Sequence, residues 1–552
     1  MMRTQKAIYA TLFCALAMAP VWAQKKQPNS GGRGQGSAAK IEVTWGEEYD
    51  MPKHHTNVGF LGNAKDGFVE VLAQGMKSMI LKKFSADLKT TGMETVNLDD
   101  MPDGAMTETF VTMKNNTWWI YSAWDRDAHM ESLHARKMNL KALSVGTDQK
   151  LLESPHKLVG GAMVGFGIPI GGMGYGKYNF NFSSDSSKLM VSYTLKPEEK
   201  KDSKSYEIDG MFVFDENMKK VNGGEFTMPR TEAMMDNDDY EVDGNGNMYM
   251  VSKVYEEERK ESKDKTTPNY HFEIAKYAPG TKKPQIIPFA LENGFAKSIL
   301  LVDDSRGNVY CSGFYSKTVH GPTTGAFMLK LEAGKTTFSK YQKGYYDFPV
   351  DVLKSFESAR TQAKIEKKEE QGKDVGSARL TLRDFLIRPD GSVTIVGEEY
   401  WMEVYYTYNN GHMEEHRKYH YNDIYAMTID ASGALLWVKK IPKTQTGSSG
   451  VGGMSYKFFV KGSDMYLFYL DNAKNATLSV ENAPAAHTDG LGGILICIKV
   501  EASGKDSRTV LFDSREVEKR ITPTALHIAN SNTLISTAAY KKQRTIYSIT
   551  VN

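Results

Sequence analysis

The residues best suited to binding lie in one aromatic-rich stretch, "YWMEVYYTYNNGHMEEHRKYHYN", which begins at Tyr400. Its Asn410-Gly411 pair is the favoured type I′ turn of a two-residue β-hairpin. That turn sets the register, and three pairs are expected to face each other: Trp401 with His420, Glu403 with Lys418, and Tyr405 with His416. Exposed aromatic rings flanked by polar groups suit a sugar ring, a peptide or a partner protein.

The other face of this hairpin is predicted to carry a second aromatic set, formed by Tyr400, Met402, Tyr406, Tyr419 and Tyr421. The candidate binding residues on the two faces are Trp401, Tyr405, Tyr406, His416, Tyr419 and Tyr421. An alternative stays open, in which the aromatics pack on a neighbouring insertion, because cross-strand aromatic pairs stabilise hairpins in any case.

Three histidines in the stretch, His412, His416 and His420, have a spacing that would stack them as metal ligands on a helix. On a strand, four residues span roughly 13 Å, so no two of these side chains can share an ion. Because the turn pair favours strands, we predict no metal site here.

Other motifs fail on their spacing. The stretch "DNDDYEVDGNGN" resembles a calcium loop, but counted from Asp243 the sixth residue is Met248 and the twelfth is Val254, where Gly and Glu are needed. The glycine-rich run from Gly160 to Tyr178 has neither G-x-G-x-x-G nor GK[ST], and no G-x-S-x-G occurs. We therefore expect no cofactor and assign no catalytic residue.

The first 23 residues contain two cations, an apolar run and a Val21-x-Ala23 end, which is typical of a cleaved secretory signal. A membrane anchor would need roughly 20 apolar residues, and polar residues follow this run at once. Residues 24–39 are rich in Gly, Ser and Gln and are predicted to be a flexible tether. We expect an exported bacterial protein of the periplasm or outer surface, with no transmembrane segment after cleavage.

The charge balance bears on the kind of partner, and the cysteine content bears on disulfide bonds. The signal holds two of the 69 Lys and Arg, which leaves 67 cations against 67 Asp and Glu. A nucleic-acid partner is not expected without a basic excess. Cys311 and Cys497, the two remaining cysteines, lie in apolar runs and are predicted to be buried thiols rather than a disulfide.

Residues 40–552 repeat one unit: a polar turn, an apolar strand, a variable connection and a second apolar strand. We count eight units, whose first strands begin near Phe68, Thr117, Leu189, Asn247, Asn308, Ser392, Met465 and Thr533. A spacing on the order of 50 to 85 residues, with flanking short strands, is typical of propeller blades with insertions. The prediction is an all-β, eight-bladed propeller, with seven blades as the fallback and a set of β-sandwiches as the competing architecture.

The eighth unit ends without a fourth strand, whereas "IEVTWGEEYDMP" near the start has no strand before it. We expect this segment to pair with "TIYSITVN" and close the ring, because an open ring would expose two unpaired edges.

The turn and strand "DSRGNVYCSGF", and more loosely "PDGSVTIVGEE", resemble the D-x-x-G-N-x-Y repeat of bacterial β-propeller proteins. That resemblance implies a fold only, because such propellers host unrelated functions.

The long connections of such a propeller are expected on one face, where loops carry function. One of them, "DVLKSFESARTQAKIEKKEE", is predicted to be a short amphipathic helix lying on that face. Cations at the starts of innermost strands are candidate binding residues at the channel mouth: Arg230, Lys297, Arg379 and Arg520. The expected function is a non-catalytic binding or scaffold module for a protein or glycan at the cell envelope. The alternative is a carbohydrate-active hydrolase or lyase with acidic residues at the channel mouth.

Overall fold

The computed structural model describes residues 39–63, 67–160, 176–258, 264–291, 294–409, 412–448, 450–490 and 492–552. The predicted signal peptide and nearly all of the predicted tether lie outside these ranges. So do most of the glycine-rich run and the Asn410-Gly411 turn.

The described residues form eight mostly antiparallel sheets of four to six strands, most of which follow one another in sequence. Four sheets come from the first half of the chain. They comprise β2 (Thr56–Asn63), β3 (Gly67–Gln74), β4 (Ser78–Phe84) and β5 (Thr90–Asn97); β6 (Met106–Met113), β7 (Asn116–Asp125), β8 (Met130–Asn139) and β9 (Ser144–Ser154); β10 (Asn179–Phe182), β11 (Lys188–Thr194), β12 (Ile208–Asp215) and β13 (Lys220–Thr227); and β14 (Met235–Val242), β15 (Met248–Tyr255), β16 (Tyr270–Tyr277) and β17 (Gln285–Phe289).

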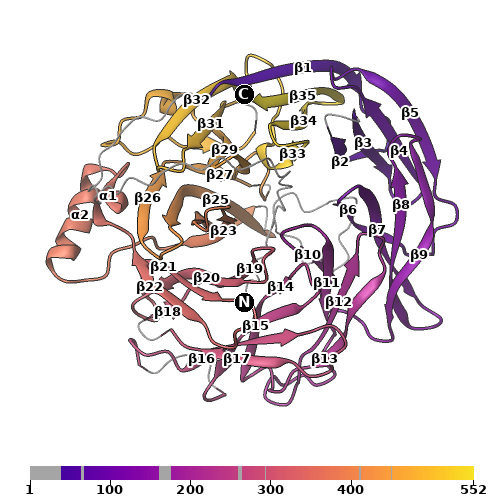
Figure 1. Cartoon of the computed structure of the whole chain (residues 1–552). Helices are drawn as coiled ribbons and strands as arrows, with labels where there is room; N and C mark the ends of the chain where they lie inside the picture. Colours follow the sequence, from indigo (N-terminus) through magenta and orange to yellow (C-terminus); the bar gives the residue numbers. More distant parts are fainter. Residues whose placement is uncertain are drawn as a thin grey trace.

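The other four sheets repeat this order with additions. They comprise β18 (Phe295–Ala296), β19 (Leu300–Asp303), β20 (Val309–Ser316), β21 (Gly325–Leu331) and β22 (Ser339–Asp347); β23 (Leu380–Ile387), β24 (Val393–Asn409), β25 (His412–Ile429), β26 (Leu435–Ile441), β27 (Gln445–Gly447) and β30 (His487–Thr488); β28 (Lys457–Lys461), β29 (Asp464–Asp471), β31 (Ile494–Val500) and β32 (Asp506–Asp513); and β33 (His527–Ile528), β34 (Thr533–Tyr540), β35 (Gln543–Val551) and β1 (Ile41–Asp50). Figure 1 shows the sheets around a common centre, with first strands such as β6 and β10 toward it and last strands such as β5 and β9 at the rim.

The repeated polar turns depend on an aspartate. In the "DSRGNVY" turn, Asp304 accepts hydrogen bonds from the backbone N–H groups of Arg306 and Asn308 (2.9 and 3.1 Å) and from the Asn308 side chain (2.7 Å). Gly307 has φ of 87°, a conformation that costs glycine little. The Asp243 turn forms the same bonds with Asn245 and Asn247, so the segment that resembles a calcium loop is a strand-to-strand turn.

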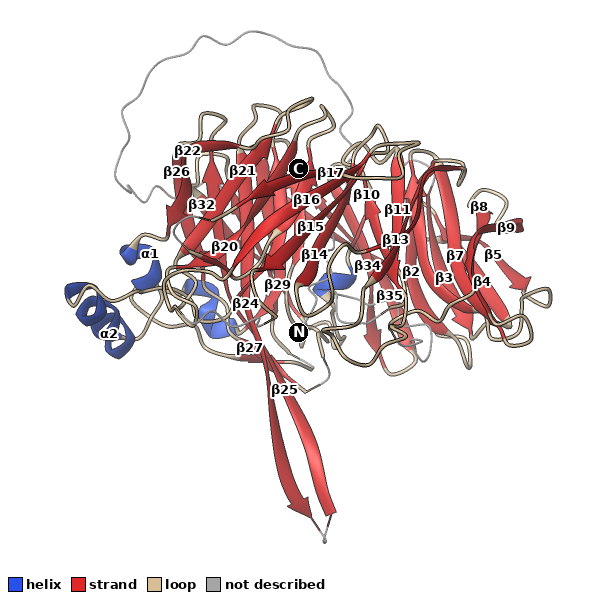
Figure 2. Cartoon of the chain, turned by 90° about the horizontal axis from the view of Figure 1, so that it is seen from below, coloured by secondary structure: helices blue, strands red, loops and turns tan. Residues whose placement is uncertain are grey.

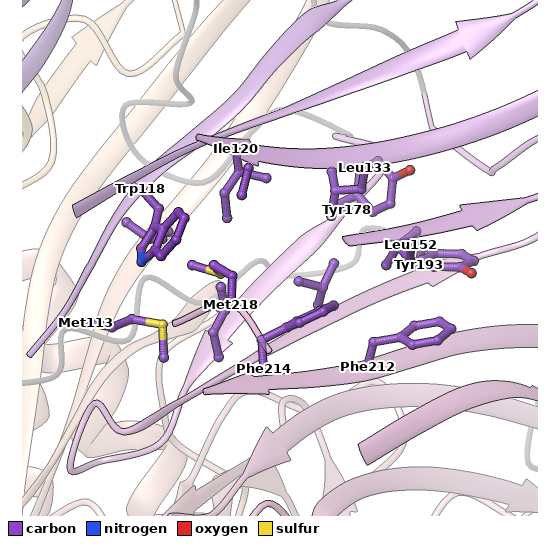
Figure 3. Close-up of a cluster of buried hydrophobic side chains, with 14 of the residues drawn as sticks. Met113, Trp118, Ile120, Leu133, Leu152, Tyr178, Tyr193, Phe212, Phe214 and Met218 are labelled. Atoms are coloured by element: carbon purple, nitrogen blue, oxygen red, sulfur yellow. The ribbon is translucent and has the colours of Figure 1, made fainter. Parts of the chain in front are cut away.

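The hydrophobic core lies between neighbouring sheets rather than at the centre of the molecule. Figure 3 shows one of these layers, in which Trp118, Ile120 and Leu133 of one sheet face Phe212 and Phe214 of the next. Apolar contact on both faces explains why the second strand of a sheet is a continuous buried run, as in β20. Cys311 and Cys497 are buried in such runs and form no disulfide with each other, as predicted.

The segment predicted to be one amphipathic helix is two helices, α1 (Val350–Lys354) and α2 (Ala359–Glu370), so this prediction is wrong in detail. The chain turns sharply between them, where Phe356 has φ of 59°. Leu353 is the buried residue of α1, whereas α2 buries none. The helices lie outside the ring of sheets (Figure 1). Two short 3-10 turns, η1 (Ala473–Thr477) and η2 (Pro523–Ala525), complete the helical elements of the described chain.

The first described strand completes the last sheet. β1 pairs antiparallel with β35 from Ile41 opposite Val551 to Asp50 opposite Gln543, with one irregularity after Trp45. The Trp45 ring lies 5.1 Å from the Phe512 ring and 5.2 Å from the Tyr547 ring.

A buried carboxylate fastens this pair to the first sheet. Glu70 of β3 is fully buried and accepts hydrogen bonds from the Tyr49 hydroxyl of β1 (2.5 Å) and the Asn57 amide of β2 (2.6 Å). Burial raises the pKa of Glu70 to about 7, although the hydrogen bond from Tyr49 and the nearby charges of Lys82 and Arg544 oppose the shift. The carboxyl group therefore binds a proton more tightly in the folded chain than in the unfolded one.

We predict that Glu70 makes the folded protein less stable as pH rises from about 4.5 to about 7. The raised pKa stabilises the fold fully below the unfolded value, and that contribution is lost as pH rises through the folded value. The difference in free energy of unfolding between the natural protein and Glu70→Gln should change by on the order of 3 kcal/mol over this range. Chemical denaturation at a series of pH values measures it, and parallel stability curves for the two proteins would contradict the assignment.

Candidate functional site

One hairpin extends out of the body formed by the sheets (Figure 2). Near the sheet, β24 pairs with β23 as far as Glu399, and β25 pairs with β27 only from Tyr419 to Tyr421. Beyond these points, β24 and β25 pair only with each other in the described chain, and Figure 2 shows them extending beyond the body of the molecule. Both outer edges of the extension therefore have no neighbouring strand in the described chain, although the Tyr400 N–H at its base donates to the Arg379 carbonyl (3.0 Å).

The register predicted from the turn is confirmed. Trp401 faces His420, Glu403 faces Lys418 and Tyr405 faces His416. Rings of the first pair stack with centroids 4.4 Å apart and planes 4° apart, and rings of the third with centroids 5.2 Å apart and planes 20° apart. His416 also forms a 2.6 Å hydrogen bond with the Thr407 hydroxyl. These contacts order one face of the hairpin along its length.

The opposite face has aromatic residues that nothing covers. Tyr406 is 57% exposed and Tyr408 78%, and Met413, opposite Tyr408, is 69% exposed. On the stacked face, Tyr405 is 50% exposed. Tyr405 and Tyr406 are among the candidates predicted from the sequence, whereas Tyr408 and Met413, whose place near the tip makes them accessible, are not.

The remaining candidates of the hairpin lie nearer its root. Trp401, His416 and Tyr419 are partly exposed. Tyr421 is 1% exposed, and its ring packs against that of Tyr400 with centroids 4.9 Å apart. The Tyr421 ring therefore does not belong to the exposed surface. The aromatic ring of Tyr421, at the root of the hairpin, is therefore packed. The rings of Tyr405, Tyr406 and Tyr408, toward the tip, are exposed.

A buried ionic cluster holds the root. Glu398 of β24 accepts hydrogen bonds from Lys443 Nζ (2.8 Å), Arg383 Nε (3.0 Å) and the Ser455 hydroxyl (2.9 Å). The side chains of Glu398 and Lys443 are fully buried. Lys443 also donates to the Tyr421 carbonyl (2.8 Å), so the cluster ties both strands of the hairpin to the next sheet, which follows Ser455. Burial lowers the pKa of Lys443 even though Glu398 opposes this.

The point of departure is also marked in the backbone. The register of β24 and β25 is regular up to Glu398 opposite Ile424 and resumes at Tyr400 opposite Tyr421, with one extra residue on β25. Such a bulge bends a strand and changes the direction of its side chains. Arg379, just before β23, places its guanidinium 4.9 Å from the centre of the Trp401 ring and adds a cation–π contact at this bend.

Two acids near the root have raised pKa values. Burial raises the pKa of Asp384 to about 6 and that of Glu399 to about 7. Each accepts a hydrogen bond, Asp384 from the Tyr456 hydroxyl (2.7 Å) and Glu399 from the Ser377 hydroxyl (2.6 Å). Such shifts occur in catalytic acids and in structural ones alike, so they do not select the hydrolase or lyase alternative.

The four cations predicted at strand starts do not gather at one place. Arg379 contacts the hairpin, as described. Arg230 forms two 3.0 Å hydrogen bonds with Glu273, and Lys297 donates to the Val319 carbonyl (3.1 Å). Arg520 lines a separate pocket with residues of the β34–β35 turn.

His412, His416 and His420 lie along one strand, β25, as the sequence predicted. In the described ranges, no group of three or more His, Cys, Asp or Glu residues is arranged to hold a metal ion. Nor does any helix in those ranges combine the length and hydropathy of a membrane span.

The repeated four-stranded sheets around one centre, with a projecting hairpin, define the class of fold as a β-propeller. No protein-family model matches the chain, and no curated protein sequence matches it.

Several solved structures are similar in backbone. A prolyl endopeptidase is 8% identical over 88% of this chain, with a TM-score of 0.38. The match covers 52% of the endopeptidase, so this chain spans about half the length of that protein. The WD40 domain of SCAP from fission yeast is 8% identical over 92% of this chain and 98% of its own, with a TM-score of 0.35. The β-propeller domain of the Trilobed protease from Pyrococcus furiosus is 10% identical over 83% and 95%, with a TM-score of 0.31. Similarities this low do not bear on function.

We predict that Lys443→Met lowers the free energy of unfolding by about 3 kcal/mol, because it leaves Glu398 buried with one fewer cation. The double variant Glu398→Gln/Lys443→Met should recover part of this loss, because the uncompensated charge is gone. Lys317→Met is the matched control: its exposed ion pair with Asp347 should contribute no more than about 1 kcal/mol. Equal effects of Lys443→Met and Lys317→Met in chemical denaturation would show that the cluster does not hold the root.

Proposed function

We propose that the chain is an exported, non-catalytic binding propeller of the bacterial cell envelope, and that the β24–β25 hairpin is its contact with a partner protein. The observation that carries the proposal is the free extension of the hairpin, with Tyr405, Tyr406, Tyr408 and Met413 exposed. The first 23 residues, with the pattern of a secretory signal, support export.

The chemistry of the hairpin favours a protein over a glycan. Beyond Tyr400 on β24, and beyond Tyr419 toward the turn on β25, its two edges have no neighbouring strand in the described chain, so a strand of another protein can pair with them. Its faces combine aromatic rings with charges of both signs, among them the ion pair of Glu415 and Arg417 (2.8 Å). Aromatic residues surrounded by polar groups are typical of the energetically important part of a protein interface.

The root suits this role because it is rigid. The buried pair of Glu398 and Lys443 and the stacked rings of Trp401 and His420 fix the direction of the hairpin before any partner arrives. A contact segment that is already ordered loses less conformational entropy on binding.

To test this proposal, we would shorten the hairpin by deleting residues 404–408 and 413–417, which removes five facing pairs and keeps the root and the turn. A partner would be cross-linked in native envelopes, identified by mass spectrometry, purified, and its Kd measured with each variant. The shortened protein should bind at least about tenfold more weakly, and Tyr406→Ser/Tyr408→Ser should weaken binding in the same direction. Tyr206→Ser, at a tyrosine 50% exposed elsewhere, is the control and should leave Kd unchanged.

An identified partner that binds the shortened protein with unchanged Kd would overturn the proposal. So would purified protein that binds only glycans, or that degrades polysaccharide, the activity of the hydrolase or lyase alternative.

We propose further that the eight sheets are the blades of one ring and that β1 closes it. The antiparallel pairing of β1 with β35 and the contacts of Trp45 support this architecture. In a closed ring, the last sheet has no open edge on its β35 side.

Deleting residues 41–52 should therefore lower Tm by about 5 °C or more, because it exposes β35 and the rings that Trp45 covers. Deleting residues 24–38, a segment of similar length predicted to be tether, is the control and should leave Tm unchanged. If the two deletions gave the same Tm in thermal unfolding, β1 would not close the ring.

A further inference from the structure

A second candidate site lies in the last sheet, separate in sequence from the hairpin. A pocket of about 370 Å³ is lined by Arg520, Ala539, Tyr540, Lys541 and Arg544. Its volume falls in the range of small-molecule sites. Three of its five lining residues are cations, and of these the sequence predicts only Arg520 as a candidate binding residue.

The sheet register explains why the cations converge. Arg520 forms an antiparallel bridge with Ala539, and Ala539 faces Arg544 across the β34–β35 pair. The three residues therefore form one row across the sheet, with their side chains on one face and the two arginines about 10 Å apart. Alanine in the middle leaves a hollow between two long side chains.

Part of this arrangement is fixed before any ligand binds. The Arg544 guanidinium donates to the backbone carbonyls of Lys541 and Gln543 (3.0 Å each), which restricts its position. Lys541 stands in the turn with φ of 53° and lies 5.1 Å from the Tyr540 ring centre. Arg520 is exposed at the pocket rim.

No carboxylate balances these charges directly. Within the described ranges, Arg520, Lys541 and Arg544 form no ion pair. The charge of Arg544 does act on the buried Glu70, but that carboxyl already accepts hydrogen bonds from Tyr49 and Asn57. Two cations about 10 Å apart on one sheet face still repel each other, and an anion bound between them would offset that repulsion.

We propose that this pocket is an oxyanion site, which binds a small ligand through a phosphate, sulfate or carboxylate group. The guanidinium groups of Arg520 and Arg544 donate to the oxyanion from the two sides of Ala539, and Lys541 adds a third charge from the turn. The ring of Tyr540, 36% exposed, forms an apolar wall for the rest of the ligand.

Calorimetric titration of the purified protein with inorganic phosphate, sodium sulfate and sodium glucuronate tests the proposal. At least one probe should bind saturably, with an affinity that falls as salt rises. Arg520→Gln and Arg544→Gln should each weaken binding at least about tenfold, because each removes a charge-assisted hydrogen bond. Tighter binding of phosphate or sulfate would identify a tetrahedral group, and tighter binding of glucuronate a uronate-type carboxylate.

Two further variants separate the pocket from general surface charge. Lys542→Gln removes the same charge from the next residue of the turn, outside the pocket lining, and should leave Kd within about twofold of the natural value. Ala539→Leu keeps every charge and fills the hollow, so it should abolish binding while Tm stays near the natural value.

The proposal would be overturned if none of the three probes bound saturably at concentrations up to about 10 mM. Such an affinity would be weaker than a single good ionic contact gives. Binding that Lys542→Gln weakens as much as Arg520→Gln would overturn it too. Neither result affects the hairpin proposal, and the protein with the shortened hairpin should bind these probes unchanged.

Discussion

The structure depends on apolar contact between neighbouring sheets. Second strands such as β20 are buried along their whole length, and the large apolar clusters combine residues of adjacent sheets. No sheet of this kind is stable alone in water, because its two apolar faces would be exposed. Apolar contact between neighbouring sheets makes them interdependent.

The hairpin is the exception, and the chain stabilises it with polar rather than apolar contacts. A two-stranded ribbon has little stability of its own in water. Here the ribbon grows out of a sheet whose interior holds the fully buried pair of Glu398 and Lys443. A buried pair contributes less net stability than apolar residues of the same size would, but it favours one arrangement of its neighbours. The stacked rings of Trp401 and His420 extend that order outward.

The sequence predicted features that depend on neighbours along the chain or on the turn between two strands. The Asp304 turn, the register of Tyr405 with His416 and the buried state of Cys311 are of this kind. Apart from the pairing of β1 with β35, features that depend on the convergence of distant segments were missed. Nothing local in "VGEEY" distinguishes Glu398, which meets Lys443 through folding. The pocket at Arg520 needed its bridge to Ala539, which no periodicity indicates.

The pairing of β1 with β35 has a consequence for the time order of folding. During synthesis β1 emerges before every other described strand, and β35 emerges after all of them. Ile41, Val43 and Trp45 pack in the cluster of the last two sheets, so they stay uncovered until nearly the whole described chain has been made. The entropic cost of closing a loop grows only with the logarithm of its length, so the great length of this loop adds little to that cost. Contacts between residues so distant in sequence nevertheless form late in folding. The nascent chain thus exposes an unpaired strand with apolar side chains, which is prone to aggregate. We expect the chain to depend on chaperones until the last sheet assembles.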